Sequence, residues 1–274
     1  MFKQPKRLLT VTNAKTVKGQ EKGYLTFILY MAPHTTNDKG ANLCPYASNG
    51  CRNACLHNSG RAGVFNHIPK ARINKANYFL FDRVNFFVQL KNEVQKSIIY
   101  AEKRGFIPVF RLNGTTDISF EAFKVYDGKN IFDTYPDVQF YDYTKNFNRY
   151  NKPMPKNYHL TFSRSETNHD TAMGLLHMGH NVAMVFDGQL PTTYKGFKVI
   201  NGDENDLRFL DKRKVIVGLK FKRITVKGGA QINKDAITSG FVLRTYKRSE
   251  TFARINKIYG NIDIIIKRKQ TVEN

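Results

Sequence analysis

The chain has 274 residues, 41% of them hydrophobic, which is enough apolar material for one large α/β domain or two small ones. Lys and Arg number 44 against 22 for Asp and Glu, and the formal net charge of +22 favours a polyanionic partner, nucleic acid or a phosphate-rich substrate, over a merely basic surface. No apolar run approaches the roughly 18 residues that cross a bilayer, and the basic start lacks the apolar core of a signal peptide, so we expect no membrane contact and a cytoplasmic location.

The predicted elements alternate between strands and helices. Residues 1–20 are polar and basic and predict a mobile arm or an edge strand, whereas residues 24–31 are almost continuously apolar, as in a strand buried on both faces. Helical spacing predicts a long helix or a kinked pair over roughly 69–103. Further strands are predicted at 106–112, 138–143, 158–163, 181–186, 196–200 and 214–219, and short helices at 120–125 and 171–177. This alternation predicts a mostly parallel sheet, either open or forming a closed or partial (β/α) barrel.

All three cysteines, Cys44, Cys51 and Cys55, lie in one loop just past the first strong strand. In a cytoplasmic protein thiols stay reduced, and three soft sulfur donors spaced Cys-x6-Cys-x3-Cys suit an iron–sulfur cluster or zinc. A [4Fe–4S] cluster held by three cysteines keeps one iron open to a ligand. In a zinc site, a histidine could fill the fourth position: His34, His57 or His67.

Polar side chains gather just after the predicted strands, where both open sheets and barrels bind ligands. Each alone could be a turn former or a helix cap. Together with the cysteine loop they form a candidate cavity lining for cofactor or substrate, with Lys145 and Arg164 suited to phosphate. The residues selected for cofactor or substrate binding are Arg111, Asn113, Asp117, Asp142, Lys145, Ser163, Arg164 and Asp203. The same lining also includes Thr115, Tyr143, Ser165, Glu166, Asp187, Asn201 and Asp206.

We expect residues 1–222 to form the partial (β/α) barrel that carries the metal site, and residues 223–274 a basic C-terminal extension packed on it. In the last fifty or so residues, Lys and Arg are interleaved with aromatic residues such as Phe241, Tyr246 and Tyr259. That mixture is typical of surfaces that bind single-stranded nucleic acid or RNA. The aromatic residues could equally form the core of a small subdomain.

Several short motifs carry a family resemblance: Asn42-Leu43-Cys44-Pro45-Tyr46-Ala47, Gly50-Cys51-Arg52, Ala54-Cys55-Leu56, Arg111-Leu112-Asn113-Gly114-Thr115 and Asp206-Leu207-Arg208-Phe209-Leu210. Over roughly residues 24–222 the chain resembles the bacteriophage gene product eighty-eight domain family. The resemblance implies a phage or mobile-element origin, and hence the host cytoplasm, without implying an activity.

A more distant likeness concerns mechanism. Three cysteines after the first strand of a partial barrel are similar to the arrangement in radical S-adenosylmethionine enzymes, although their typical spacing is Cys-x3-Cys-x2-Cys. The likeness implies a [4Fe–4S] cluster and S-adenosylmethionine as cofactor.

Three functions are compatible with these patterns. The first is a phage-type iron–sulfur protein, with radical chemistry like that of the distant relatives, that acts on nucleic acid or a nucleotide. The second is a nucleic-acid-binding protein without catalysis, in which the metal braces a loop. The third is a zinc hydrolase or deaminase, but the His-x-Glu run of the deaminases is missing.

Overall fold

A computed structural model describes residues 2–11, 14–57, 59, 61–225 and 228–245. The chain divides into two compact units, Met1–Leu243 and Arg244–Asn274. The helices and strands lie in the first unit, apart from Arg244 at the end of the last strand. Most of the predicted basic extension, including Tyr246 and Tyr259, lies outside the described residues, and the predicted organisation into residues 1–222 and 223–274 stays a prediction.

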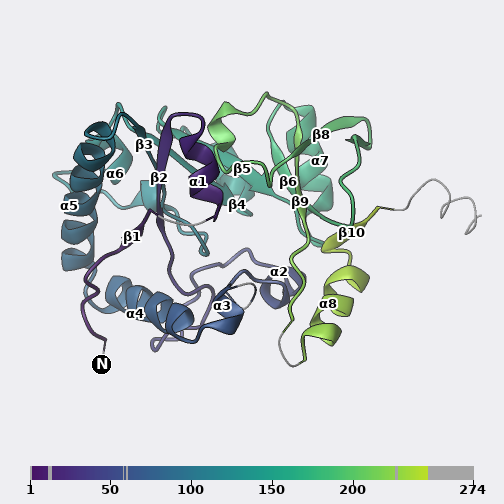
Figure 1. The fold of residues 1–274 in the computed structure, drawn as a ribbon, viewed down its shortest axis with the longest axis horizontal. Coiled ribbons are helices and arrows are strands. Elements are labelled where there is room, and N and C mark those ends of the chain that lie inside the picture. The colour runs from purple at the N-terminus through teal and green to yellow at the C-terminus, as the bar shows by residue number, and fades with distance from the viewer. Residues whose placement is uncertain (1, 12–13, 58, 60, 226–227, 246–274) are drawn as a thin grey trace, which may run out of the picture. The chain divides into compact units, whose positions relative to one another are not determined.

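The centre of the first unit is a ten-stranded, mostly parallel sheet (Figure 1). Its strands run in the order β1-β2-β3-β4-β5-β6-β9-β8-β7, with β10 paired to β6. Every pair from β2 to β8 along this order is parallel, whereas β1 on β2 and β7 on β8 are antiparallel. The bounds are β1 Leu9–Thr10, β2 Tyr24–Leu29, β3 Ile107–Arg111, β4 Gln139–Thr144, β5 Tyr158–Ser163, β6 Val182–Asp187, β7 Thr193–Tyr194, β8 Phe197–Asn201, β9 Ile216–Lys220 and β10 Val242–Arg244. The predicted α/β class with mostly parallel strands is therefore confirmed.

The strands from β2 to β6 lie side by side in chain order. This order is that of (β/α) barrels, since doubly wound sheets reverse direction at a switch point. The end strands β1 and β7 are not paired with each other in the described part of the chain, so the sheet does not close into a ring there. A partial barrel stays a prediction.

One face of the sheet is covered by α5 (Arg83–Glu102), and α4 (His67–Phe81) precedes α5 and packs against it. Between them stands Asp82, whose side chain accepts the backbone N–H of Asn85 and caps α5. The rings of Phe27, Phe110 and Phe140 form a row across β2, β3 and β4, with centroids 5.2 and 5.4 Å apart, in the same core cluster as the buried face of α5. The predicted kinked pair is confirmed.

The other helices are short. They are α1 Ala14–Gln20, α2 Asn49–Asn53, α3 Arg61–Val64, α6 Ile131–Thr134, α7 His169–His177 and α8 Gly229–Thr238. The predicted edge strand is β1, but helix α1 follows it where the sequence predicts none. The helix predicted at 120–125 is wrong: it is one 3-10 turn, Phe120–Ala122, because Asn113 turns the chain sharply just before it through its contacts with Thr116 and Ile118. None of the described helices is long and apolar enough to cross a membrane.

Candidate functional site

The cysteine loop lies across the carboxyl ends of the parallel strands, as its position after β2 predicts. The carbonyl of Leu43 accepts the N–H of Asp117 at 2.9 Å, and the thiol of Cys44 donates to the carbonyl of Thr115 at 3.6 Å, both just after β3. Beyond these strand ends, α2 packs beside α8 and α3 beside α4 (Figure 1). The loop therefore lies at the edge of the sheet where parallel α/β proteins bind their ligands.

A carboxylate that follows β5 holds the helix that carries Cys51. Glu166 accepts the hydroxyl of Ser48 and the N–H of Gly50, both at 2.7 Å, and the Ser48 oxygen in turn accepts the N–H of Cys51 at 3.2 Å. A Cβ on Gly50 would lie 2.5 Å from Cβ of Phe241 and 2.9 Å from the Glu166 carboxylate, so only glycine fits there. Its place directly after a strand put Glu166 in the predicted cavity lining, but not among the residues selected for binding, and its carboxylate is used to hold the cysteine loop.

The three thiols form no disulfide and are partly buried. Negative charge on Cys51 raises the pKa of both Cys44 and Cys55. Burial is the main cause that raises the pKa of Cys44 to about 12, and charge repulsion from the nearby Cys55 and Cys51 contributes to this rise. Burial likewise raises the pKa of Cys55 to about 11. These two thiols are protonated at neutral pH, so a metal that binds them must displace their protons.

Two cations lie beside Cys55. Both Arg72 and Lys145 lower its pKa through their charge, against the larger effect of burial. The Arg72 guanidinium lies 5.0 Å from the ring centre of Tyr30, and Lys145 Nζ donates to Ser163 Oγ at 2.6 Å. Lys145 and Ser163, predicted from two different strands, are thus brought together beside the thiols, whereas Arg72 on α4 was not predicted.

A histidine of the same loop has an unused nitrogen. His57 is buried, its Nδ1 has no hydrogen-bond partner, and its backbone N–H donates to Cys55 Sγ at 3.4 Å. Burial, with the charges of Arg72 and His34, lowers the pKa of His57 to about 4, so the ring is neutral, the form that binds metals. In chemistry, these thiols and this imidazole fit zinc or an iron–sulfur cluster.

The side chains that could donate to a metal do not lie close enough together to bind one. Among the described residues, no group of three or more His, Cys, Asp or Glu side chains could hold a metal ion as the structure stands. His67, another predicted zinc ligand, is exposed at the start of α4, where its ring packs 5.7 Å from that of Phe65. Binding a metal through the three cysteines would therefore require the loop to draw its sulfurs together.

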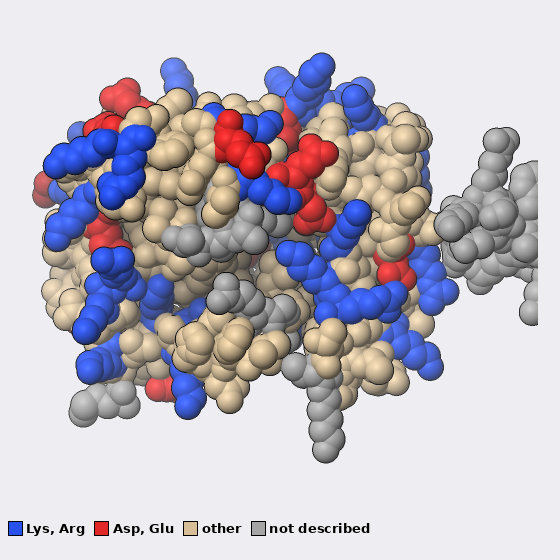
Figure 2. Space-filling model, in the orientation of Figure 1, with Lys and Arg blue, Asp and Glu red and all other residues tan. Residues whose placement is uncertain are grey.

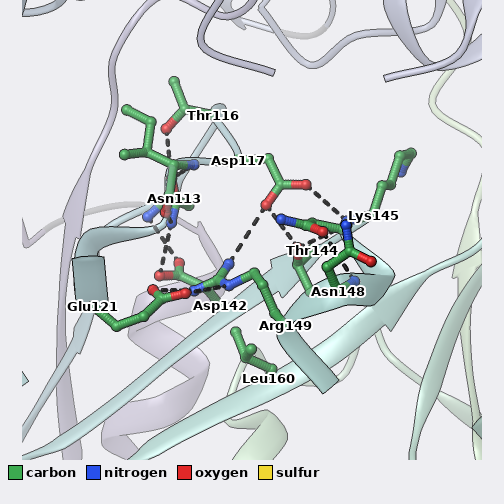
Figure 3. A network of polar contacts seen from close by, with 12 residues as sticks. Asn113, Thr116, Asp117, Glu121, Asp142, Thr144, Lys145, Asn148, Arg149 and Leu160 are labelled. Atoms are coloured by element: carbon green, nitrogen blue, oxygen red, sulfur yellow. Dashed lines mark hydrogen bonds and ion pairs between the residues drawn. The ribbon is translucent and has the colours of Figure 1, made fainter. Parts of the chain in front are cut away.

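Three of the predicted site residues belong to a buried network between β3, β4 and β5 (Figure 3). Asp142 accepts the backbone N–H of Asn113 and the hydroxyl of Tyr158, both at 2.8 Å, and burial raises its pKa to about 6. The Asn113 side chain donates to the Ile118 carbonyl at 2.9 Å and accepts the Thr116 hydroxyl at 2.9 Å. These groups are used within the protein, and they fix the chain after β3.

The third member, Asp117, fixes the chain after β4. Its carboxylate accepts the Thr144 hydroxyl and the Lys145 N–H, both at 2.8 Å, and lies 3.6 Å from the guanidinium of Arg149 (Figure 3). Arg149 is 3% exposed and donates twice to Glu121, at 2.8 and 2.7 Å. The network thus positions Lys145 beside the cysteine loop.

The remaining predicted residues also have partners inside the protein. Arg111 pairs with Asp206 at 2.9 Å, and the Asp203 carboxylate accepts the N–H of Lys220 at 2.8 Å. Arg164 donates to the carbonyls of Gly240 and Phe241. Their predicted roles toward cofactor, substrate or phosphate stay predictions.

Positive charge is spread widely over the surface. Figure 2 shows Lys and Arg side chains across the face in view, where they outnumber Asp and Glu. This distribution follows from the formal net charge of +22. It does not by itself select one face for a polyanionic partner.

Comparisons with known proteins give one result. No curated protein and no solved structure is similar enough to match the chain. The likeness to radical S-adenosylmethionine enzymes therefore stays a prediction. The chain matches the family model described as gene product 88 over residues 7–245, most of its length, and it therefore belongs to that family.

Proposed function

We propose that Cys44, Cys51 and Cys55 hold a metal centre, a [4Fe–4S] cluster in the first place, in a protein that acts on nucleic acid or a nucleotide. The observation that carries the proposal is the position of three free, electrically coupled thiols at the carboxyl edge of a parallel sheet, with two cations beside them. The soft donor set supports iron–sulfur or zinc over magnesium or calcium.

The surrounding residues would contribute in two ways. A cluster with three protein ligands can bind a further ligand at its fourth iron and exchange single electrons with it. The cations Arg72 and Lys145 would stabilise the negative charge that the thiolates gain on metal binding, and the Lys145–Ser163 pair would donate hydrogen bonds to an anionic group such as a carboxylate or phosphate. His57 Nδ1 would serve as the fourth ligand if the metal is zinc.

The metal is tested on the full chain purified without oxygen. Iron, acid-labile sulfide and zinc are measured in the wild type and in Cys51→Ser. The proposal predicts iron and sulfide in the wild type and their loss in the variant. Zinc at full occupancy would show that the site is a zinc site and not a cluster. A wild-type protein that holds neither metal after reconstitution would contradict the proposal.

Catalysis is tested separately from binding. If the protein is an enzyme with S-adenosylmethionine as cofactor, isothermal titration should show that this molecule binds the cluster-loaded protein and not the metal-free one. Absence of binding favours the alternative, a nucleic-acid-binding protein in which the metal braces the cysteine loop. In that case Cys51→Ser should weaken binding of a single-stranded oligonucleotide, whereas unchanged binding would remove the bracing role.

A further inference from the structure

A basic pocket lies where the turn between β7 and β8, together with the start of β8, meets the end of α7. Its volume is about 340 Å³, and it is open to solvent. Four of its six lining residues are basic, and none is acidic. The lining residues are His177, Lys195, Gly196, Phe197, Lys198 and Lys214.

A phenylalanine in the pocket lining contacts two of the basic side chains. The ring of Phe197 packs edge-on against His177, with centroids 4.9 Å apart, and Lys214 Nζ lies 5.9 Å from the centre of the same ring. None of the three lysines forms a salt bridge with a described carboxylate. Their charges therefore remain available to an anion that enters from solvent.

Two of the lysines occupy backbone conformations that side chains rarely adopt. Lys195 has φ of 47° and is followed by Gly196 at 82°, a two-residue turn that usually takes Asn-Gly. Lys214 has φ of 62°. Glycine or asparagine would suit both positions better. With lysine at both positions, two ammonium groups line one pocket, and each position costs conformational free energy in the backbone.

The Lys195 ammonium and the Arg164 guanidinium compete for the acceptor nitrogen of one imidazole, that of His169. Its Nζ lies 3.1 Å from Nε2 of His169, while Arg164 Nε donates to Nδ1 of the same ring at 3.3 Å. A neutral imidazole has one acceptor nitrogen. When Nδ1 accepts from Arg164, Nε2 carries a hydrogen and faces the ammonium, donor against donor. A ligand with several acceptor oxygens would relieve this contact.

We propose that this pocket binds a phosphate group through Lys195, Lys198, Lys214 and His177. A phosphate offers oxygens to several cations at once, and the pocket's volume is at the lower end of ligand sites, enough for a phosphate with an attached sugar. The site uses no residue of the cysteine loop and stands whether or not that loop binds a metal. The phosphate could come from a nucleic-acid backbone or from a free phosphate or nucleotide.

The test uses the wild-type chain first. Inorganic phosphate is titrated while the backbone amide signals are followed by nuclear magnetic resonance. The proposal predicts saturable shifts at Gly196, Lys198 and Lys214. Shifts there no larger than those at two exposed lysines, Lys96 in α5 and Lys103 directly after it, would overturn it.

A pair of matched variants then identifies the source of the phosphate. Lys198→Gln with Lys214→Gln removes two pocket charges, and the α5 variant, Lys96→Gln with Lys103→Gln, removes one charge from α5 and one directly after it. If the nucleic-acid backbone is the source, the pocket variant should lower the salt dependence of oligonucleotide binding by about two contacts and the α5 variant should not. If phosphate saturates the pocket but both variants bind oligonucleotides like the wild type, the source is a free phosphate or nucleotide. Metal content is unaffected in either case, so this result is independent of the proposed metal centre.

Discussion

At the scale of single residues, the position of the cysteine loop depends on a tightly packed contact at Gly50. Gly50 lies in the first turn of the helix that carries Cys51, and a Cβ added to it would meet Cβ of Phe241 at 2.5 Å and the Glu166 carboxylate at 2.9 Å. The carboxylate is a flexible side chain and can move, but the Cβ of Phe241 is fixed to its backbone. A methyl group at position 50 should therefore push the cysteine loop away from Phe241, which follows α8.

Gly50→Ala should destabilise the protein by about 1–3 kcal/mol through overpacking, and it should speed the reaction of Cys51 with a thiol reagent. The matched control is Gly174→Ala in α7, where a Cβ meets nothing within 4 Å. Alanine there should stabilise the helix by roughly 0.5–1 kcal/mol. Chemical denaturation measures both changes, and equal behaviour of the two variants would contradict the contact.

A partly buried histidine, His159, should make stability depend on pH. Burial, with the charges of Arg208 and His180, lowers the pKa of His159 to about 4, whereas the unfolded chain keeps a value near 6.5. Between these values the unfolded state binds the extra proton. The stability that His159 provides is therefore complete above pH 6.5 and is lost as the pH falls toward 4, by up to about 1.4 kcal/mol per pH unit.

The variant His159→Gln should lose stability less steeply than the wild type over this range. His67→Gln, which changes an exposed histidine, should follow the wild type. Unfolding free energies from urea titrations at several pH values provide the measurement. Parallel curves for all three proteins would show that His159 is not kept neutral by the fold.

At the scale of elements, the ends of β3 and β4 are held by buried charge. Arg149 is paired with Glu121 and lies near Asp117, and both carboxylates are largely removed from solvent. Removing Arg149 leaves two largely buried carboxylates without the cation that compensates their charge. Arg149→Met should therefore cost about 3–5 kcal/mol of stability, measured by thermal or chemical unfolding.

The matched control is Arg223→Met, because Arg223 pairs with Asp187 at the same 2.7 Å distance but has a side chain that is 55% exposed. Its loss should cost less than about 1 kcal/mol. A small effect of Arg149→Met would mean that the network in Figure 3 does not hold these strand ends.

The strands could be predicted well because parallel strands are buried on both faces and read as apolar runs, as β2 does. Helix α8 was not predicted, although Ala236 and Ile237 pack with Phe241 and Val242 in an apolar cluster. Another buried residue of this helix is polar, and it is held by the backbone of a preceding loop. Asn233 exchanges hydrogen bonds of 2.8 Å with the backbone N–H and carbonyl of Ile224.

The candidate site was predictable to the same extent. Lys145 and Ser163 could be paired because the carboxyl ends of neighbouring parallel strands meet. The sequence could not show that Asn113 and Asp142 satisfy each other, since that depends on where β3 ends relative to β4. The positions of Glu166 and Arg72 at the cysteine loop could not be predicted, because no periodicity reveals the path of that loop.

At the scale of the whole molecule, the formal net charge of +22 predicts salt-sensitive binding to nucleic acid. Affinity for a single-stranded oligonucleotide should fall roughly 10³-fold or more between 50 and 200 mM salt if several phosphates are contacted. Fluorescence anisotropy measures it. Affinity that does not change with salt would contradict a polyanionic partner.

The proposed binding of one metal centre by three cysteine sulfurs can be tested directly. X-ray absorption at the iron edge, on the full chain purified without oxygen, reports directly which atoms surround the iron. The account predicts iron bound to sulfur in the wild type, and its absence from the variant in which Cys44, Cys51 and Cys55 are all replaced by serine. Iron surrounded only by oxygen and nitrogen, or an unchanged spectrum in the triple variant, would contradict it.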